Sequence, residues 1–224
     1  MTVQQQELIN KPDLAFITKQ NWFSVWKNYF WPSSTRIAIL SILLAIEIVC
    51  VLFSKYVMGI VRIQGFLVLE LNLWVFAVAA VATNFFWSSI FTLSSIWLRF
   101  AFGLSEPIGL LSLTFVDFGS IVALSLVLFI VKRIYFVSNK YEKYSNHEFK
   151  WIVLACLAAI VVGSLLAAIT NYTFILKLYG TPKESIKGFT VLTFGFTVLK
   201  LTINYAIFLV VYDRVKTILK NSHI

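Results

Sequence analysis

Charged residues, histidine, cysteine and proline are all scarce in this chain. Only 13% of its 224 residues are charged, and it contains two histidines, two cysteines and four prolines. Soluble domains average about 25% charged and about 45–50% apolar residues, whereas 59% of this chain is hydrophobic and its mean hydropathy is +0.85. A soluble protein of this size would have too few polar side chains to cover its core. The many aromatic and aliphatic residues also exclude a disordered chain.

Motifs for metal, nucleotide or hydrolytic chemistry are absent as well. Cys50 and Cys156 lie inside apolar runs, which predicts buried free thiols rather than a disulfide framework. His147 and His223 fall in polar segments, and no histidine or cysteine spacing fits a metal site. The chain has no phosphate-binding G-x-x-x-x-G-K-[ST] motif, no nucleophile elbow and no paired carboxylates on one helical face. We therefore expect neither an enzyme nor a cofactor.

Six apolar stretches predict an all-α integral membrane protein with six transmembrane helices. A membrane-spanning helix takes about 20 residues, and the alternation typical of membrane β-strands is missing. The stretches cover residues 37–54, 66–83, 85–102, 108–131, 151–176 and 189–212. Only Asn84 and its neighbours separate the second from the third, which predicts a tight helical hairpin. The membrane domain is expected over residues 36–216, between an N-terminal segment, 1–35, and a short cytoplasmic tail, 217–224.

The positions of lysine and arginine predict that both termini are cytoplasmic. With this orientation, 12 of the 19 basic residues lie on the inner side and Lys200 lies within the last stretch. The six on the outer side are Lys55, Arg62, Arg99, Lys177, Lys183 and Lys187. Before the first stretch, tryptophans and other aromatics alternate with lysines, which predicts an interfacial helix ending near Pro32. The alternative is an unstructured tail.

Several ionisable residues fall within the predicted spans, where each costs about 2.5–3.5 kcal/mol at the helix centre. At about 1.5 Å per residue, Asp117, Lys200 and Glu47 lie roughly 14–17 Å deep. Glu70 and Asn72 are expected to lie shallower, on the outer side. This convergence predicts a polar pocket that opens to the outside. The alternative is a structural pair between Lys200 and either Asp117 or Glu47 that only neutralises charge.

Two other groups of residues have two interpretations each. Asn171 and Tyr172 lie at the outer end of the fifth stretch, where they would line the mouth of a pocket or anchor the chain at the membrane interface. Ala38, Ser41 and Ala45 recur at helical spacing in the first stretch, and small residues let helices approach closely. Their neighbour would lie in this chain or in another subunit.

Three short segments carry a resemblance to a known family. They are Pro107-Ile-Gly-Leu-Leu, residues 163–180 with the ending Asn171-Tyr-Thr-Phe-Ile-Leu-Lys-Leu-Tyr-Gly, and Phe194-Gly-Phe-Thr-Val-Leu-Lys200. With six predicted spans and a basic C-terminus, the chain resembles the substrate-binding S components of energy-coupling factor (ECF) vitamin transporters, in particular the riboflavin-binding branch. Thr197 stands where that branch usually has asparagine, and Asp117 stands where an uncharged residue is usual.

The resemblance implies the substrate-binding subunit of an ECF-type ABC importer in the plasma membrane of a bacterium. Such a subunit captures a small water-soluble vitamin, riboflavin or another, from outside. Its partners would be a membrane scaffold subunit and two cytoplasmic ATPase subunits, which would account for the missing phosphate-binding motif. No nucleic acid is expected to bind. Lys200 matches the lysine that contributes to the family's ligand pocket, and Thr197 and Asp117 would lie beside it.

The same resemblance makes the face of Ala38, Ser41 and Ala45 a candidate contact for the scaffold subunit. Three other classes of function compete with this interpretation. One is a stand-alone proton-coupled secondary transporter that uses Asp117, Glu47 or Lys200. The others are an intramembrane enzyme acting on lipid and an accessory subunit without a ligand.

Overall fold

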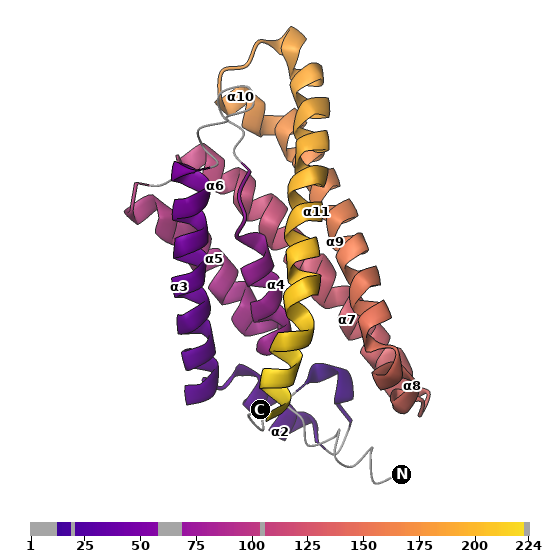
Figure 1. The fold of residues 1–224 in the computed structure, drawn as a ribbon. Helices are drawn as coiled ribbons and strands as arrows, with labels where there is room; N and C mark the ends of the chain where they lie inside the picture. The colour runs from indigo at the N-terminus through magenta and orange to yellow at the C-terminus, as the bar shows by residue number, and fades with distance from the viewer. Residues whose placement is uncertain (1–12, 19–20, 58–68, 104–105, 222–224) are drawn as a thin grey trace.

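In a computed structural model the chain forms a bundle of helices that run lengthwise beside one another (Figure 1). The structure describes residues 13–18, 21–57, 69–103 and 106–221, and contains no strand in these ranges. Its long helices are α3 (Ser34–Tyr56), α5 (Phe85–Ala101), α7 (Gly119–Val137), α9 (Glu148–Thr170) and α11 (Lys183–Asn221). The predicted all-helical class is confirmed.

Shorter elements complete the bundle. They are η1 (Leu14–Phe16), α2 (Trp22–Phe30), α4 (Leu73–Ala82), α6 (Pro107–Leu113), η3 (Thr114–Phe118), α8 (Tyr141–Asn146), η4 (Asn171–Ile175) and α10 (Leu176–Leu178). Both η3 and η4 are π-helical turns. Each widens one turn of a longer helical run without ending it, since α6, η3 and α7 follow one another directly, as do α9, η4 and α10.

Four helical runs are long and apolar enough to cross a membrane. They are Trp22–Tyr56, Pro107–Val137, Glu148–Leu178 and Lys183–Thr217. The other two predicted spans correspond to shorter helices, because α4 has 10 residues and α5 has 17. A 10-residue helix is about 15 Å long, which is half of the roughly 30 Å hydrocarbon core of a bilayer. The four long runs are compatible with a membrane location.

The second apolar stretch is not helical over its whole length, contrary to the prediction for residues 66–83. Residues 69–72 are non-helical and precede α4, while 66–68 lie outside the described residues. Side chains from other helices satisfy the backbone of this segment. The Leu71 N–H donates to Ser54 Oγ at 3.0 Å, and Asn204 Nδ2 donates to the Glu70 carbonyl oxygen at 2.8 Å. Backbone groups that do not pair within a helix need other hydrogen-bond partners inside a bundle, and these side chains provide them.

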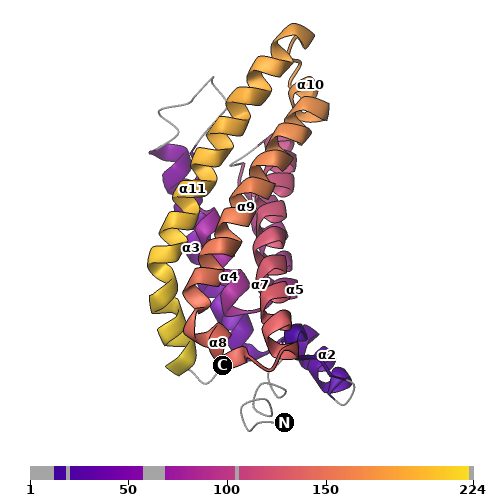
Figure 2. The same ribbon diagram turned by 90° about the vertical axis from the view of Figure 1, so that its right-hand side faces the viewer.

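The predicted hairpin around Asn84 is present between α4 and α5. The Asn84 side chain accepts a hydrogen bond from the Trp87 N–H at 3.0 Å, which caps the start of α5. Its Nδ2 also donates to the carbonyl oxygen of Tyr29 at 2.9 Å, which ties the hairpin to α2. The helix predicted in the N-terminal segment is α2, and it ends at Phe30, before Pro32. It lies across the end of the bundle (Figure 2).

The centre of the bundle is α4, in which seven of the ten residues are buried. It packs against α11, α5 and α3, and α9 lies between α7 and α11. The contact between α9 and α11 is close at Gly163. A Cβ at this position would lie 2.7 Å from Leu201 Cδ1 and 3.1 Å from Ser120 Cβ. Glycine therefore allows the close approach of these helices.

Basic residues gather at one end of the bundle. This end holds α2, α8 and the C-terminal part of α11, whereas α10 and the start of α11 lie at the other end (Figure 1). Nine described basic residues lie at the first end: Lys27, Arg36, Lys132, Arg133, Lys140, Lys143, Lys150, Arg214 and Lys216. Four lie at the other end: Lys55, Lys177, Lys183 and Lys187. The assignment of Arg99 to the outer surface is wrong, because its side chain is only 2% exposed and points into the bundle.

Candidate functional site

Five charged side chains form one connected, buried cluster, which we call the charge network: Glu47, Glu70, Arg99, Asp117 and Lys200. They come from α3, the segment before α4, α5, η3 and α11. Residues far apart in the sequence therefore meet at one place inside the bundle.

The contacts of the network run in a chain from α3 to η3. Arg99 Nη2 and Nε bond to Glu47 Oε1 at 2.7 and 3.1 Å, and Arg99 Nη1 lies 3.4 Å from Glu70 Oε1. Lys200 Nζ then lies 3.3 Å from Glu70 Oε2. The same Nζ bonds to both carboxylate oxygens of Asp117, at 3.1 and 3.3 Å. Glu70 thus bridges the two cations, and each cation has a second carboxylate of its own.

The network is buried and carries an uneven number of charges. The side chains of Glu47, Arg99, Lys200 and Asp117 are between 0 and 7% exposed, while that of Glu70 is 17% exposed. Three carboxylates face two cations, so the formal charge is −1 when all five groups are ionised. Buried charges need partners because taking an ion out of water costs several kcal/mol. A proton on one of the carboxylates would balance the excess negative charge.

Two helices present polar stripes toward the interior beside the network. On α5 the buried polar residues are Ser88, Thr92, Ser95 and Arg99, and on α11 they are Thr193, Thr197, Lys200 and Asn204. Both sets are spaced by three or four residues, which places their side chains on one helical face. Each stripe leads along its helix to one cation of the network. Polar side chains therefore follow one face of each of these two helices over several turns.

Asp117 occupies the π-helical turn η3. Its side chain is fully buried, and it receives two of the three side-chain hydrogen bonds that Lys200 donates. Asn171 and Tyr172 occupy the second π-helical turn, η4. Turns of this kind are rare and occur frequently at functional sites. Three of the residues predicted at the site thus lie in widened turns, which the apolar pattern alone does not show.

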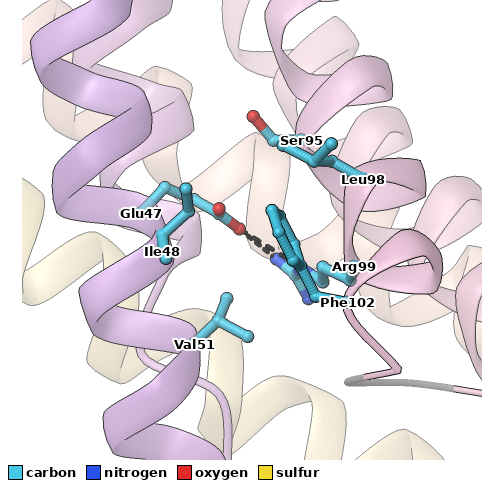
Figure 3. Close-up of a pocket in the computed structure, with 7 residues that line it drawn as sticks. All are labelled: Glu47, Ile48, Val51, Ser95, Leu98, Arg99 and Phe102. Carbon is cyan, nitrogen blue, oxygen red and sulfur yellow. Dashed lines mark hydrogen bonds and ion pairs between the residues drawn. The ribbon is translucent and has the colours of Figure 1, made fainter.

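A small pocket lies between α3 and α5, beside the ion pair of Glu47 and Arg99 (Figure 3). Its volume is about 10 Å³, which is room for about one water molecule. Ser95 lines it, and the buried Ser95 Oγ has no hydrogen-bond partner among the described residues. The seven lining residues are Glu47, Ile48, Val51, Ser95, Leu98, Arg99 and Phe102.

The structure brings together the predicted residues Asp117, Lys200 and Glu70, and connects Glu47 to them through Arg99. The pair between Asp117 and Lys200, considered above as a structural alternative, is present. Glu47 bonds to Arg99 rather than to Lys200. The carboxylate of Glu70, predicted to lie shallower than the other charges, contacts Lys200. The depth estimate assumes a continuous helix where residues 69–72 are not helical.

The other predicted binding residues lie in varied environments. Asn72 is fully buried, and neither atom of its amide finds a partner in the described part of the chain. Thr197 is buried one turn before Lys200. Asn171 donates to the Ala167 carbonyl oxygen of its own helical run at 2.8 Å, and Tyr172 is 51% exposed. No described hydrogen bond joins Asn171 or Tyr172 to the charge network.

The face of Ala38, Ser41 and Ala45 lies on the outside of the bundle. Only four residues of α3 are buried: Leu43, Glu47, Val51 and Ser54. The small residues therefore do not pack into the described core of this chain.

Arg99 is the member of the network that the sequence interpretation misses. It lies three residues from the end of an apolar stretch, which assigns it to the outer loops. Its position in the series Ser88, Thr92, Ser95 and Arg99 is the signal that places it on a buried polar face.

Among the described residues, no group of three or more histidine, cysteine, aspartate or glutamate side chains could hold a metal ion. The carboxylates of the network are instead held by Arg99 and Lys200. Comparisons with protein-family models, with curated proteins and with solved structures find no match to this chain.

Proposed function

We propose that this chain is the membrane-embedded, substrate-binding subunit of an ECF-type ABC importer. The observation that carries the proposal is the charge network, because five ionisable side chains are kept in an apolar bundle at a considerable energetic cost. Ionisable residues at such positions typically mark substrate or ion pathways. The segments that resemble S components include Lys200, a member of this network.

The proposed topology has six spans with both termini in the cytoplasm of a bacterial cell. The spans are α3, α4 with the segment before it, α5, the run Pro107–Val137, the run Glu148–Leu178 and α11. The uneven distribution of basic residues, nine at the end that holds α2 and four at the other end, supports this orientation. The exposed tryptophans of α2 would lie in the headgroup zone of the inner leaflet.

A membrane-impermeant maleimide tests this topology on intact cells. A cysteine introduced at Lys183 is expected to react from outside, and one introduced at Glu142 is expected to react only after the cells are opened. Both positions are exposed in the structure, so burial does not account for a difference. Labelling of position 142 in intact cells would reverse the orientation.

The substrate would be a small water-soluble vitamin, riboflavin or another, bound at the outer half of the bundle. Lys200, Asp117 and Glu70 would supply charged contacts. The amide of Asn72, which has no partner among the described residues, would supply a donor and an acceptor. Thr197 shares the buried face of Lys200. Energy would come from two ATPase subunits, since this chain has no phosphate-binding motif of its own.

The scaffold subunit of the importer would contact the outward face of Ala38, Ser41 and Ala45. This face is small, helical and outside the buried core of the described chain. Replacing Ala38 and Ala45 with leucine is expected to impair complex formation and uptake while ligand binding persists. Unchanged uptake with the complex intact would remove this contact from the proposal, and the matched control is leucine at exposed Val210 on α11.

A second candidate is a proton-coupled secondary transporter that works alone. The excess carboxylate of the network favours it, because three carboxylates beside two cations can bind and release a proton. The two candidates differ in their source of energy. Uptake by the importer requires the ATPase subunits, whereas uptake by the transporter collapses when an uncoupler removes the proton gradient.

One experiment tests the proposal and separates the candidates. The chain is purified in detergent from cells of its own source, and any small molecule that it retains is identified by mass spectrometry. Uptake of that molecule is then measured in cells that express the chain with and without an ATPase module. Retention of one vitamin, with uptake only in the presence of the module, supports the importer. Uptake without the module that an uncoupler abolishes would support the second candidate instead.

A further inference from the structure

We propose that Arg99 and Lys200 form a receptor for a carboxylate and that Glu70 occupies this receptor in place of a substrate. The substrate would be a vitamin that carries a carboxylate group, which riboflavin lacks, and this group would bind the two cations after Glu70 has left them. The inference rests on the proposed function, because it names the chemical class of the molecule that the subunit captures.

The position of Glu70 is that of a bridging ligand. Each of its oxygens contacts a different cation, Oε1 with Arg99 at 3.4 Å and Oε2 with Lys200 at 3.3 Å. A planar carboxylate with two separate acceptor oxygens is suited to such a pair of donors. Any small molecule with the same group can make the same two contacts.

Each of the two cations has a carboxylate partner besides Glu70. Arg99 is held by Glu47 through two hydrogen bonds of 2.7 and 3.1 Å, and Lys200 is held by Asp117 at 3.1 and 3.3 Å. Without Glu70 the network consists of two complete ion pairs, with two carboxylates and two cations. The receptor is therefore already formed before a ligand arrives, which lowers the entropic cost of binding.

Glu70 is the most weakly held member of the network. The carboxylate of Glu70 lies 3.3 Å from Lys200 and 3.4 Å from Arg99. Glu47 and Asp117 each make at least one shorter contact with their cations, at 2.7 and 3.1 Å. The Glu70 side chain is 17% exposed, against at most 7% for the others. The other four residues lie on helical turns, whereas Glu70 lies in the non-helical segment before α4. Glu70 is thus the carboxylate that a ligand can displace at the lowest cost.

The pocket beside Arg99 is lined by Glu47 but not by Glu70 or Lys200. Ser95 lies one turn before Arg99 on α5 and lines this pocket together with Glu47 (Figure 3). Its hydroxyl is buried and has no partner in the described part of the chain. The pocket itself holds about one water molecule. The carbon skeleton of the ligand would therefore take the space that the Glu70 side chain leaves.

The charge count favours a carboxylate over a neutral or cationic ligand. A bound carboxylate restores the three-to-two ratio that the bundle already accommodates with Glu70 in place. It also gains two charge-assisted hydrogen bonds, which are roughly twice as strong as neutral ones. A neutral ligand makes weaker bonds to cations that already have partners. A cationic ligand would have to lie next to Arg99 and Lys200.

The test replaces Glu70 with alanine in the full-length chain and adds formate, the smallest carboxylate. In detergent solution, sodium formate is expected to raise the melting temperature of the Glu70→Ala protein in a saturable manner, beyond the effect of equal sodium chloride. In the wild-type protein the half-saturating concentration should be at least about tenfold higher, because a tethered carboxylate competes at high effective concentration. Glu184→Ala, at an exposed glutamate of α11, is the matched control and should respond like wild type.

A charge-neutral variant locates the effect. Adding Lys200→Met together with Asp117→Asn to Glu70→Ala removes one cation together with its own partner. The apparent affinity for formate should then fall by about tenfold or more, as expected for the loss of a charge-assisted hydrogen bond. If Glu70→Ala folds only when it is prepared in formate, that rescue supports the receptor. Folded Glu70→Ala protein without a saturable formate effect, or failure to fold in both salts, would overturn it.

A covalent version gives a second readout. In a Cys50→Ala, Cys156→Ala background, Glu70→Cys is alkylated with iodoacetate or with iodoacetamide, which differ only in the carboxylate that they attach. The carboxymethylated protein should recover the melting temperature of wild type, and the amide should not; equal recovery contradicts the receptor. None of these measurements uses uptake or ATPase subunits. A chain that binds formate without any ATP-driven uptake would keep the receptor and lose the importer, and the reverse outcome would keep the importer and lose the receptor.

Discussion

Replacing Arg99 with methionine tests whether the charge network is a buried ionic structure. The guanidinium of Arg99 is 2% exposed and bonds to Glu47, itself 2% exposed, at 2.7 Å. Methionine keeps much of the apolar volume and removes the charge. Two carboxylates then lose their shared cation, and the network changes from three acids with two bases to three acids with one. Breaking a buried pair by removing one partner typically costs about 3–5 kcal/mol, so the free energy of unfolding should fall by about that amount.

Two comparisons separate this effect from a loss of packing. Adding Glu47→Gln to Arg99→Met removes the unpaired charge, so the double variant should regain about 1–3 kcal/mol of stability. Lys216→Met breaks the pair with Glu148, which has a similarly short distance of 2.6 Å, but its side chains are 48% and 23% exposed. Pairs of this kind contribute about 0–1 kcal/mol. Distance is thus matched between the two pairs, and burial is the difference.

The measurement is equilibrium unfolding in mixed micelles with a denaturing detergent, followed by circular dichroism and checked by refolding. The expected order of stability is wild type, then Lys216→Met, then the double variant, with Arg99→Met lowest. An Arg99→Met protein as stable as Lys216→Met would refute the reasoning. That result would mean that water reaches the network and that an unpaired carboxylate there costs little free energy.

Two further predictions concern the parts of the fold that hold the network in place. Asn204→Leu removes the side-chain hydrogen bonds to the Glu70 carbonyl oxygen and the Trp74 N–H. Thermal unfolding should show a loss of about 1–3 kcal/mol for each group left unpaired. The control is Thr202→Ala, at an exposed position, which should change stability by less than about 0.5 kcal/mol. Gly163→Val places side-chain atoms within the contact of α9 and α11 and should cost about 1–3 kcal/mol. Valine at Gly195, where an added Cβ would have no neighbouring atom within 4 Å, is its control, and an equal loss there would contradict the role of the close approach.

Local sequence patterns predict the helices well because the causes of helix formation are local here. Long apolar runs without proline form the long helices, and Pro32 marks the end of α2. Asn84 predicts the hairpin because its side chain caps the helix that starts next to it. Each of these signals acts within a few residues along the chain.

The interruption before α4 has a cause that no local pattern reveals. Residues 69–72 belong to an apolar stretch that is typical of a continuous helix. Their backbone is instead satisfied by Ser54 on α3 and Asn204 on α11, which are 17 and 134 residues away from their partners. A local sequence pattern describes only the helix in which a polar residue lies. It therefore cannot predict that the side chains of Ser54 and Asn204 bond to the backbone of residues 70 and 71 in place of helical hydrogen bonds.

The same limit explains how the candidate site could be predicted and why the prediction is incomplete. The depth estimate counts residues along each predicted span separately, and it places Asp117 and Lys200 at a similar depth. The structure shows that the two residues are in contact. The estimate places Glu70 on a continuous helix, although residues 69–72 are not helical. It also leaves out Arg99, whose long side chain reaches inward from near the end of α5. Without Arg99 the predicted set holds three carboxylates and one lysine. That balance suggests a proton carrier, in which acids are unpaired.

Including Arg99 changes the interpretation of the whole cluster. Glu47 then has its own cation, Asp117 has its own cation, and Glu70 alone is the acid in excess. The excess acid is also the one that is most exposed and the one on irregular backbone. These properties coincide in one residue at the point where two cations meet. A fixed structural network has no need for its bridging carboxylate to be the least buried, whereas a binding site that must exchange an internal carboxylate for an external one does.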